Sequence, residues 1–458
     1  MPWRWTFDGR QVPVDGPRLT EKFMANQKIK NLRTFFGALA LTALVGCGGS
    51  GGSESSPEGT PVPDVSEVCP APKLARITID TQDAQPVVSK INYVPAQFVI
   101  ESGDGGLHDV VLPAKIRGRG NSTWRLPKKP YLVKLDESSP LLGMPAGKKW
   151  VLLANHADKS LLRNAVAFCM ARLLEMPYTS HDRFFELTMN GQYQGVYQLT
   201  NKDYEIRDLI DKQAKTYFEQ FVEGSDFDDP FVMELDERLG EDFKFRSSSG
   251  VPYTFESDTN AAQQARVQRW INEFEEILKN HEDPDRMVKI KNRMDLNSLV
   301  DMYLVNELMG NQDAFLFSVY LYRQRGGKLV YGPVWDFDLS LGNVGLADSR
   351  NPEGWHARNA QWNWYFRELL KDPEFSGLVR QRWSRLAGAV PGLNAYIDYS
   401  AAALDAAQTR NFNRWQILND YVWPYAEVIG TYAGEVAFMQ DWLNKRAHWI
   451  NEHMDELK

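Results

Sequence analysis

The sequence predicts an α+β protein in which a β-rich half with one main helix precedes a mainly helical half. Short runs rich in β-branched and aromatic residues, broken by Gly, Pro and Asp, dominate residues 71–200, and helical spacing dominates residues 201–458. The 458 residues are 43% hydrophobic, with 14 Trp, 18 Tyr and 23 Phe, which is enough for a large core. The net charge of −8 does not favour nucleic acid as a partner.

Four strands are predicted first, at residues 75–81, 97–102, 110–118 and 131–136. Residues 158–176 then place Leu and other apolar side chains at helical spacing, and Asp158 is a plausible N-cap. Residues 184–199 are typical of a β-hairpin, because Asn190-Gly191 favours the tight turn.

The second half begins with a more polar stretch after residue 200. Helices are predicted around 261–280 and 295–310, and a strand pair follows at 317–324 and 328–335. The remainder, 360–458, is helical and rich in Trp. The predicted order is therefore a β-rich half and a helical half that carries one small hairpin.

The N-terminal residues are predicted to be an export signal. Residues 28–33 are basic and residues 35–46 are apolar, and twelve apolar residues are too short to span a bilayer. The segment 24–46 therefore reads as a signal peptide headed by Met24, and residues 1–23 as a start site placed too early. Cys47 ends a stretch that resembles the lipobox of bacterial lipoproteins, with an ordinary signal and a chance cysteine as the alternative.

Residues 47–70 are rich in Gly, Ser and Pro and are predicted to be a flexible tether. With Cys47 lipidated, we expect an exported lipoprotein at the outer membrane or cell surface whose membrane contact is through the lipid anchor. No CxxC motif is present, so structural zinc is not expected. Cys69 and Cys169 could pair in an oxidising compartment, which the sequence leaves open.

Three clusters could carry chemistry, and the first is basic. Arg117, Gly118, Arg119, Gly120, Asn121 and Ser122 are followed by Lys128, Lys129 and Lys134. Glycines let backbone N–H groups approach an anion, and Arg and Lys neutralise it. The cluster is predicted either to hold phosphates or to be a hairpin with a solvated basic face.

The other two clusters are acidic. Asp313 follows a predicted helix and precedes a strand, where it could accept a proton from a hydroxyl or form a turn. If Asp336 and Asp338 continue the strand, their side chains point to the same face of it. Two carboxylates on one face repel each other unless a cation, a proton or a basic group lies between them. If the chain turns at Asp336, one is a ligand and the other a cap. Carboxylate oxygens suit Mg²⁺ or Mn²⁺, which usually arrive with substrate phosphates.

Six segments together resemble the CotH kinase family, and they lie in family order between about residue 74 and residue 390: IRGRGNSTW, KKPYLVKLD, LLGMPAGKKWVLLANHADKSLLRN, NGQYQGVYQL, VNELMGNQD and GPVWDFDLSLGN. The resemblance implies an atypical protein kinase with a two-lobed fold that transfers phosphate from ATP to Ser or Thr of secreted proteins. It implies that Gly118–Ser122 and a lysine, first Lys134 and second Lys129, hold ATP, and that Asp313 is catalytic. It also implies that Asp336 binds the metal, while Asp338 either assists it or caps the following turn.

Ser318 departs from the kinase pattern, since a kinase catalytic loop usually places Asn, a second metal ligand, five residues after its Asp. Ser318 is therefore expected to be a weaker ligand. It motivates one alternative, a weakly active or inactive kinase fold used for adhesion or surface assembly. A secreted carbohydrate-active hydrolase is the other, suggested by export, tryptophans and scattered carboxylates. The sequence specifies neither the substrate nor the oligomeric state.

Overall fold

The structure is a computed structural model, and it describes residues 64–101, 110–201, 210, 229–240, 243–257, 259–345, 350–424 and 427–457. These residues belong to one unit, Gly59–Lys458. The predicted signal peptide, the lipidation site Cys47 and residues 47–63 of the predicted tether lie outside the described residues. None of the helices in the described part of the chain is both long enough and apolar enough to cross a bilayer.

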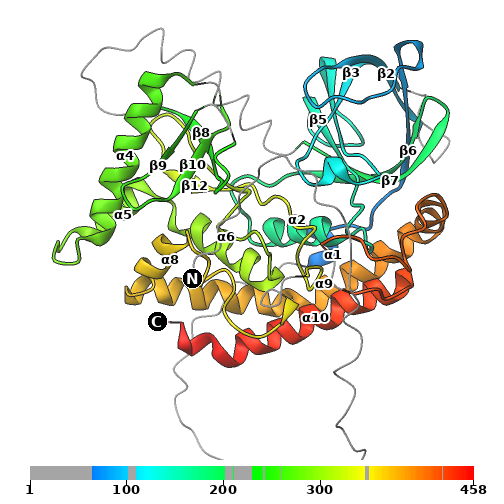
Figure 1. Ribbon diagram of the computed structural model, residues 1–458. Coiled ribbons are helices and arrows are strands. Elements are labelled where there is room, and N and C mark those ends of the chain that lie inside the picture. Colours follow the sequence, from blue (N-terminus) through cyan, green and yellow to red (C-terminus); the bar gives the residue numbers. More distant parts are fainter. Residues whose placement is uncertain are drawn as a thin grey trace, which may run out of the picture. The chain divides into compact units, whose positions relative to one another are not determined.

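The first half of the described chain forms a closed barrel (Figure 1). Its strands, in chain order, are β1 (Ala75–Thr81), β2 (Val94–Glu101), β3 (Val110–Gly118), β4 (Tyr131–Ser139), β5 (Gly147–Leu153), β6 (Asp182–Met189) and β7 (Gln192–Thr200). Around the barrel the order is β1-β2-β3-β4-β5-β7-β6, and the parallel pair β1–β6 closes it. Alternate residues such as Ile77, Ile79 and Phe98 fill the interior.

The strands and the hairpin predicted in this half are confirmed. Asn190 and Gly191 have φ of 49° and 73°, which is the backbone that the tight turn between β6 and β7 requires. The predicted helix begins later than expected, because α2 spans Arg163–Leu173. Leu161 has φ of 63°, so the chain makes a turn before the helix, and Asp158 caps that turn by accepting from the N–H of Ser160 at 3.0 Å.

A second sheet of five strands lies in the other half of the chain, in the order β12-β11-β8-β10-β9. The predicted pair is β11 (Val319–Arg323) and β12 (Leu329–Tyr331), and the additional strands are β8 (Phe231–Leu235), β9 (Lys244–Arg246) and β10 (Pro252–Phe255). The expectation of a lone hairpin in a helical half is therefore wrong. β8 pairs with β11 across more than eighty residues of chain, for example Glu234 with Tyr320, and local patterns do not reveal such pairing.

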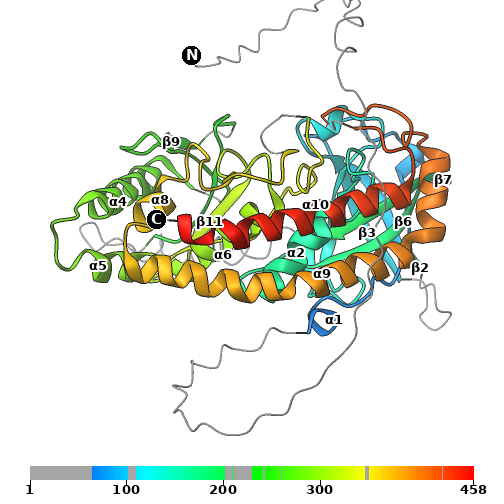
Figure 2. The same cartoon turned by 90° about the horizontal axis from the view of Figure 1, so that it is seen from below.

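Helices pack around the second sheet and extend to the barrel (Figures 1 and 2). They are α1 (Val65–Val68), α2, α4 (Ala261–Lys279), α5 (Arg286–Arg293), α6 (Leu296–Met309), α8 (Trp364–Leu369), α9 (Pro373–Arg414) and α10 (Tyr432–His453). The helix α9 contacts β7 of the barrel as well as α6 and α10. Leu132 and Val151, on the outer face of the barrel, belong to the same core as α2, so one apolar core joins the two sheets.

A disulfide joins Cys69 to Cys169, with their Cα atoms 5.7 Å apart. Cys69 is the residue that ends α1, and Cys169 lies on the buried helix α2. The bond closes a loop with a sequence separation of 100 residues, so it fastens the start of the described chain to the helix at the centre of the core.

Removing this disulfide is expected to destabilise the protein by about 2–5 kcal/mol, because a cross-link that closes a long loop restricts the unfolded chain. The test compares urea unfolding of the wild type with that of the double variant Cys69→Ala/Cys169→Ala. A reductant should lower the stability of the wild type and leave the variant unchanged. Equal stability of the two oxidised proteins would contradict the pairing.

Candidate functional site

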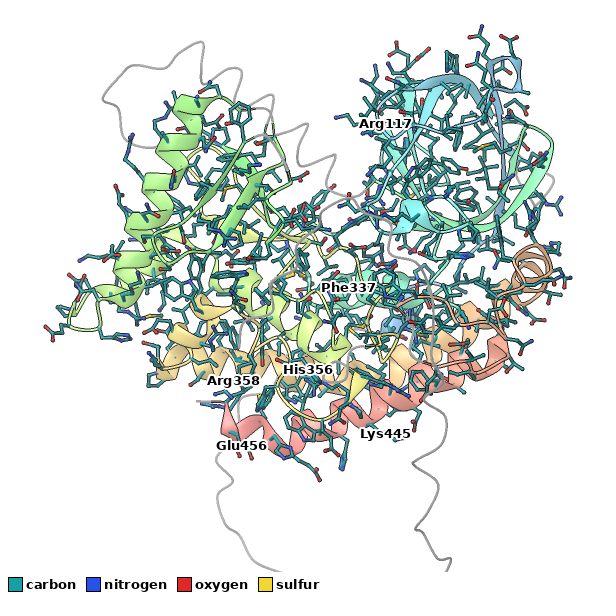
Figure 3. All side chains as sticks on the ribbon, viewed as in Figure 1. Arg117, Phe337, His356, Arg358, Lys445 and Glu456 are labelled. Carbon is teal, nitrogen blue, oxygen red and sulfur yellow. A yellow bond between two sulfur atoms is a disulfide. The ribbon has the colours of Figure 1, made fainter. Side chains whose placement is uncertain are left out.

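A cleft of about 1030 Å³ lies between the barrel and the second sheet. The barrel contributes Arg117, the segment from Arg119 to Thr123 and Leu132, and the second sheet and the turns beside it contribute several carboxylates. Figure 3 labels Arg117 on the barrel and Phe337 on the segment that follows β12. This volume is in the range of cofactor and substrate sites.

The barrel wall of the cleft is basic. Arg117, Arg119, Gly120, Asn121 and Ser122 of the basic cluster all line it. Gly120 has φ of +83°, a backbone that favours glycine, and this conformation lets the chain turn toward the cleft. The Arg119 guanidinium lies 5.5 Å from the centre of the Trp335 ring, beside Asp336 on the opposite wall. The wall therefore offers two guanidinium groups and an exposed loop to an anion.

Three residues predicted to bind nucleotide do not line the cleft. Gly118 is buried, and a Cβ there would meet the Trp124 ring, so packing explains this glycine. The Lys129 ammonium donates to the backbone oxygen of Trp124 at 2.8 Å. Lys134 alternates with the inward-facing Val133 and Leu135 and therefore lies on the outer face of β4.

Of the three lysines in the basic cluster, Lys128 is the one that shares a cavity with Asp336 and Asp338. It lines a narrow extension of the cleft of about 30 Å³, together with Asp336, Asp338 and His156. Its ammonium donates to the backbone oxygen of Val196 and, at 2.9 Å, to Asn411 Oδ1. Burial lowers the pKa of Lys128 to about 7, and a phosphate placed beside it would raise that pKa again. The sequence shows Lys128 beside Lys129 without indicating which of the two is buried.

The opposite wall carries the predicted acidic residues. Asp313, Asp336, Asp338 and Ser318 all line the cleft. Asp313 lies in the turn after α6, where its own N–H donates to Asn311 Oδ1 at 3.2 Å. β12 ends at Tyr331 and Asp336 has φ of 68°, so of the two alternatives left open by the sequence the chain turns at Asp336 and does not continue as a strand. The Ser318 hydroxyl donates to Asp336 Oδ2 at 3.3 Å.

Four further charged residues of this wall, Glu234, Asp236, Arg238 and Glu256, were not predicted from the sequence. Glu234 accepts from the Ser318 N–H at 3.0 Å and from the Tyr320 hydroxyl at 2.7 Å, so it holds the start of β11 in place. Arg238 Nε donates to Asp236 Oδ1 at 2.8 Å. Glu234 lies on β8, and Asp236 and Arg238 follow directly after it, in a part of the sequence without a recognisable motif.

The carboxylates of the cleft influence one another. The pKa of Asp313 is raised to about 7, mainly by burial and in part by the nearby charge of Asp336, while Arg238 opposes the shift. Burial also raises the pKa of Asp338 well above its usual range, with contributions from Asp336, Asp158 and Asp313. Carboxylates with raised pKa values in a cleft favour a bound cation or a role in proton transfer.

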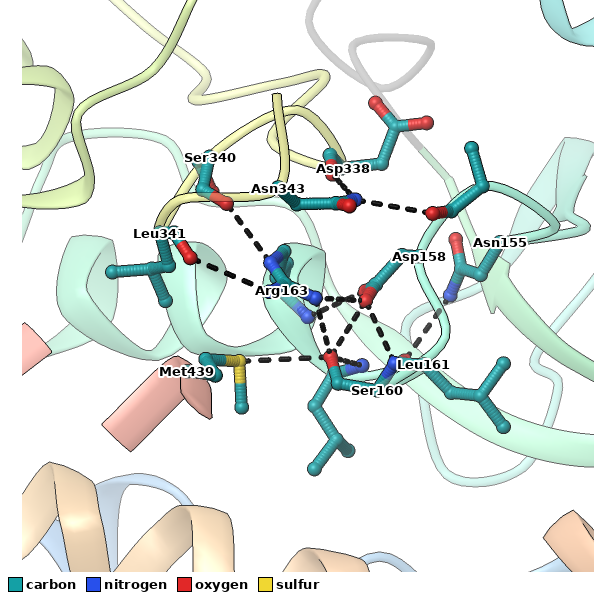
Figure 4. Close-up of polar contacts among 12 residues, drawn as sticks. Asn155, Asp158, Ser160, Leu161, Arg163, Asp338, Ser340, Leu341, Asn343 and Met439 are labelled. Atoms are coloured by element: carbon teal, nitrogen blue, oxygen red, sulfur yellow. Dashed lines mark hydrogen bonds and ion pairs between the residues drawn. The ribbon is translucent and has the colours of Figure 1, made fainter. Parts of the chain in front are cut away.

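A buried polar cluster below the cleft fixes the segment that carries Asp336 and Asp338 (Figure 4). Arg163 and Asp158 form an ion pair of 2.6 Å with both side chains fully buried. Arg163 Nε also donates to the backbone oxygen of Ser340 at 2.9 Å. The cluster thereby connects the start of α2 with residues 337–343 of the opposite wall.

Two asparagines complete this attachment. Asn164 Oδ1 accepts from the Phe337 N–H at 2.8 Å, and Asn343 Nδ2 donates to the backbone oxygens of Asp338 at 2.6 Å and Ala157 at 3.1 Å. Figure 4 shows the Asp338 carboxylate pointing away from these hydrogen bonds. Its carboxylate oxygens are therefore left for the cleft, while its backbone is held.

Replacing Arg163 with Met is expected to cost about 3–5 kcal/mol of stability, because the Asp158 carboxylate would stay buried without its cation. Denaturant unfolding measures this loss. Arg172→Met is the matched control on the same helix, since its ion pair with Asp182 is longer, at 3.3 Å, and the Arg172 side chain is partly exposed. Arg172→Met should cost less than Arg163→Met, because water can reach the partly exposed Arg172 position and Asp182 keeps its hydrogen bond from Gln198 Nε2 at 2.9 Å. An equal loss of stability in the two variants would show that the buried Arg163–Asp158 pair stabilises the protein no more than the Arg172–Asp182 pair does.

The residues of the cleft fit a nucleotide that brings its own metal ion. Across the described ranges, no three His, Cys, Asp or Glu side chains are arranged to hold a metal ion on their own. Mg²⁺ commonly uses one or two carboxylates and takes its remaining ligands from phosphates and water. Asp336 with Ser318 beside it provides such a partial ligand set, and Arg119 on the facing wall suits the phosphates.

The chain matches no curated protein sequence. A family model described as CotH kinase protein matches residues 116–450, which begin within β3, end within α10 and include Asp313, Asp336 and Asp338. That match covers most of the chain, and the chain therefore belongs to the CotH kinase protein family.

Proposed function

We propose that this protein transfers the terminal phosphate of ATP to Ser or Thr of exported or surface proteins, with Mg²⁺ or Mn²⁺ as cofactor. One observation carries the proposal: a single cleft brings the basic loop around Arg119 opposite Asp313 and Asp336. On this account the barrel with α2 corresponds to the first lobe of an atypical kinase, and the second sheet with its helices corresponds to the second lobe. Phosphoryl transfer depends mainly on positioning and charge neutralisation, which these two walls provide.

Each wall has a separate role in the proposed mechanism. Bound ATP with its metal ion supplies the phosphoryl group and neutralises charge that develops during transfer. Arg119 and the loop Gly120–Ser122 bind and orient the phosphates, and Lys128 adds a buried donor at the inner end. Asp336 holds the metal, with Ser318 and Asp338 in support. Asp313 accepts the proton of the acceptor hydroxyl, for which a pKa of about 7 is suitable.

We also propose that the protein works outside the cytoplasm as a lipoprotein anchored through Cys47. The Cys69–Cys169 disulfide supports export, because structural disulfides persist mainly in oxidising compartments. The acceptor is then an exported or surface protein, and the membrane contact is the lipid alone. This part of the proposal predicts a lipid-modified N-terminus at Cys47, which mass spectrometry of the membrane fraction would detect.

A second candidate is a weakly active or inactive kinase fold that serves adhesion or surface assembly. It is favoured by Ser318, which stands where a kinase usually has its second metal-binding Asn and which donates its hydroxyl to Asp336. Under this alternative, nucleotide binds weakly or not at all, and loss of Asp313 leaves the biological phenotype unchanged.

Two measurements on the purified full-length protein distinguish these candidates. The first is the melting temperature with and without ATP and Mg²⁺ or Mn²⁺, which should rise only when nucleotide and metal are both present. The second is transfer of label from ATP, labelled at its terminal phosphate, to casein or to the protein itself. A shift together with transfer supports the kinase proposal. No shift and no transfer with either metal would refute it.

A further inference from the structure

Two strongly exposed apolar side chains lie at the mouth of the cleft. Ile91 is 84% exposed and Trp423 is 60% exposed, and both line the cleft although 332 residues separate them in the chain. Ile and Trp are normally buried to a large extent, so their joint exposure beside a candidate active site points to a ligand.

The segment that carries Ile91 is fixed to the basic loop of the barrel wall. The Gly118 N–H donates to the backbone oxygen of Ser89 at 2.8 Å, and the Lys90 ammonium donates to the backbone oxygen of Gly120 at 3.0 Å. Arg117 in turn donates to the backbone oxygen of Lys90. Ile91 is thus presented from a backbone that is tied to the proposed phosphate-binding loop.

The connection between α9 and α10 that carries Trp423 is also anchored. Trp415 Nε1 donates to the backbone oxygen of Gln194 at 2.8 Å, which ties the start of the connection to the barrel. Lys159, which follows β5 of the barrel, donates to the backbone oxygens of Leu418 at 3.2 Å and Asp420 at 2.8 Å. An anchored connection loses little conformational freedom when a ligand contacts Trp423.

We propose that Ile91 and Trp423 bind an apolar side chain of the acceptor polypeptide, next to the Ser or Thr that receives phosphate. This inference rests on the kinase function proposed above and adds a preference for acceptors with an aromatic or large aliphatic residue beside the phosphorylated one. Two features favour a polypeptide over the nucleotide base. Both side chains are exposed at the cleft mouth, where a base would not be enclosed, and a polypeptide must enter through this mouth to reach Asp313.

Each proposed residue has a matched control on its own segment. Tyr421 is 63% exposed two residues before Trp423, and Val88 is 75% exposed three residues before Ile91, and neither lines the cleft. The variants are therefore Trp423→Ala with Tyr421→Ala as control, and Ile91→Ser with Val88→Ser as control. All four positions are on the surface, so the variants should fold, and their melting temperatures confirm it.

The test uses two synthetic peptides that share one Ser, flanked in one by Phe and in the other by Ala. We expect the wild type to prefer the Phe peptide by about tenfold in kcat/KM, which is the effect of one good apolar contact. Trp423→Ala and Ile91→Ser should each remove most of that preference while the KM for ATP stays within about twofold. The controls should keep the preference. Anisotropy of the fluorescein-labelled Phe peptide should show the same order of affinities without any turnover.

Four results would overturn the inference. The first is a wild type that phosphorylates both peptides equally well, and the second is a control variant that loses as much preference as its partner. A third is a rise in the KM for ATP in Trp423→Ala, which would show that the Trp423 ring contacts the nucleotide base. In all three the wild type is still a kinase, so the proposed function survives. If the wild type phosphorylates neither peptide, casein nor itself, the proposed function fails and the inference fails with it.

Discussion

Asp336→Asn is expected to reduce phosphate transfer at least about a thousandfold, because the neutral amide removes the main carboxylate ligand proposed for the metal. The segment around Asp336 should keep its shape, since Asn164 holds the neighbouring Phe337 N–H and Asn343 holds the Asp338 backbone. The loss should therefore appear in catalysis and in metal-dependent ATP binding, with little change in stability. The rate of labelled phosphate transfer at saturating ATP measures it.

A matched control for this variant is Asp80→Asn, since Asp80 is an exposed residue of β1 outside the cleft. Asp80→Asn should transfer phosphate at the wild-type rate. The variant Asp338→Asn should lie between the two, because Asp338 is assigned a supporting role. If Asp336→Asn kept normal activity and normal dependence on Mg²⁺, the assignment of Asp336 as the metal ligand would be wrong.

Asp313→Asn is expected to lower kcat by about a hundredfold to ten-thousandfold, which is the usual contribution of a positioned general base. The KM for ATP should change little, because Asp313 is proposed to act on the acceptor hydroxyl and not on the nucleotide. Initial rates at varied ATP concentration separate the two effects. A large rise in the KM for ATP with an unchanged kcat would place Asp313 in nucleotide binding instead.

The same residue predicts the pH dependence of transfer. Only the ionised carboxylate accepts a proton, and burial raises the pKa of Asp313 to about 7. The wild-type rate should therefore fall as the pH decreases through and below this value. A metal ion at Asp336 would offset one of the charges that raise the pKa, so the midpoint should lie at or below about 7. The residual rate of Asp313→Asn should not show this midpoint.

The sequence predicted elements whose signals are local. The Asn190-Gly191 turn and the helices α4 and α6 follow from short patterns, because their stability depends on neighbouring residues in the chain. The sequence did not predict that the first sheet closes into a barrel, since closure requires β1 to pair with β6 more than a hundred residues away. It missed β8 for the same reason, and with it Glu234 and Asp236.

The candidate site shows the same division. The aspartates could be predicted as site residues because each comes directly after an apolar helix or strand. Asp313, Asp336 and Asp338 do line one cleft. Lys134, and after it Lys129, was the lysine expected to hold ATP, whereas Lys128 is the buried one, and only its packing against Tyr197 and Asn411 distinguishes it. Gly118 was assigned to phosphate binding, whereas the close approach of Trp124 explains it.

The central claim is that the cleft performs phosphate transfer to a hydroxyl amino acid, and phosphosite mapping tests it most directly. Wild type and Asp313→Asn are incubated in parallel with ATP, Mg²⁺ and casein, and the modified residues are identified by mass spectrometry. The account predicts phosphoserine or phosphothreonine formed by the wild type and almost none formed by Asp313→Asn. Absence of any phosphorylated residue with the wild type, or equal phosphorylation by the two proteins, would contradict it.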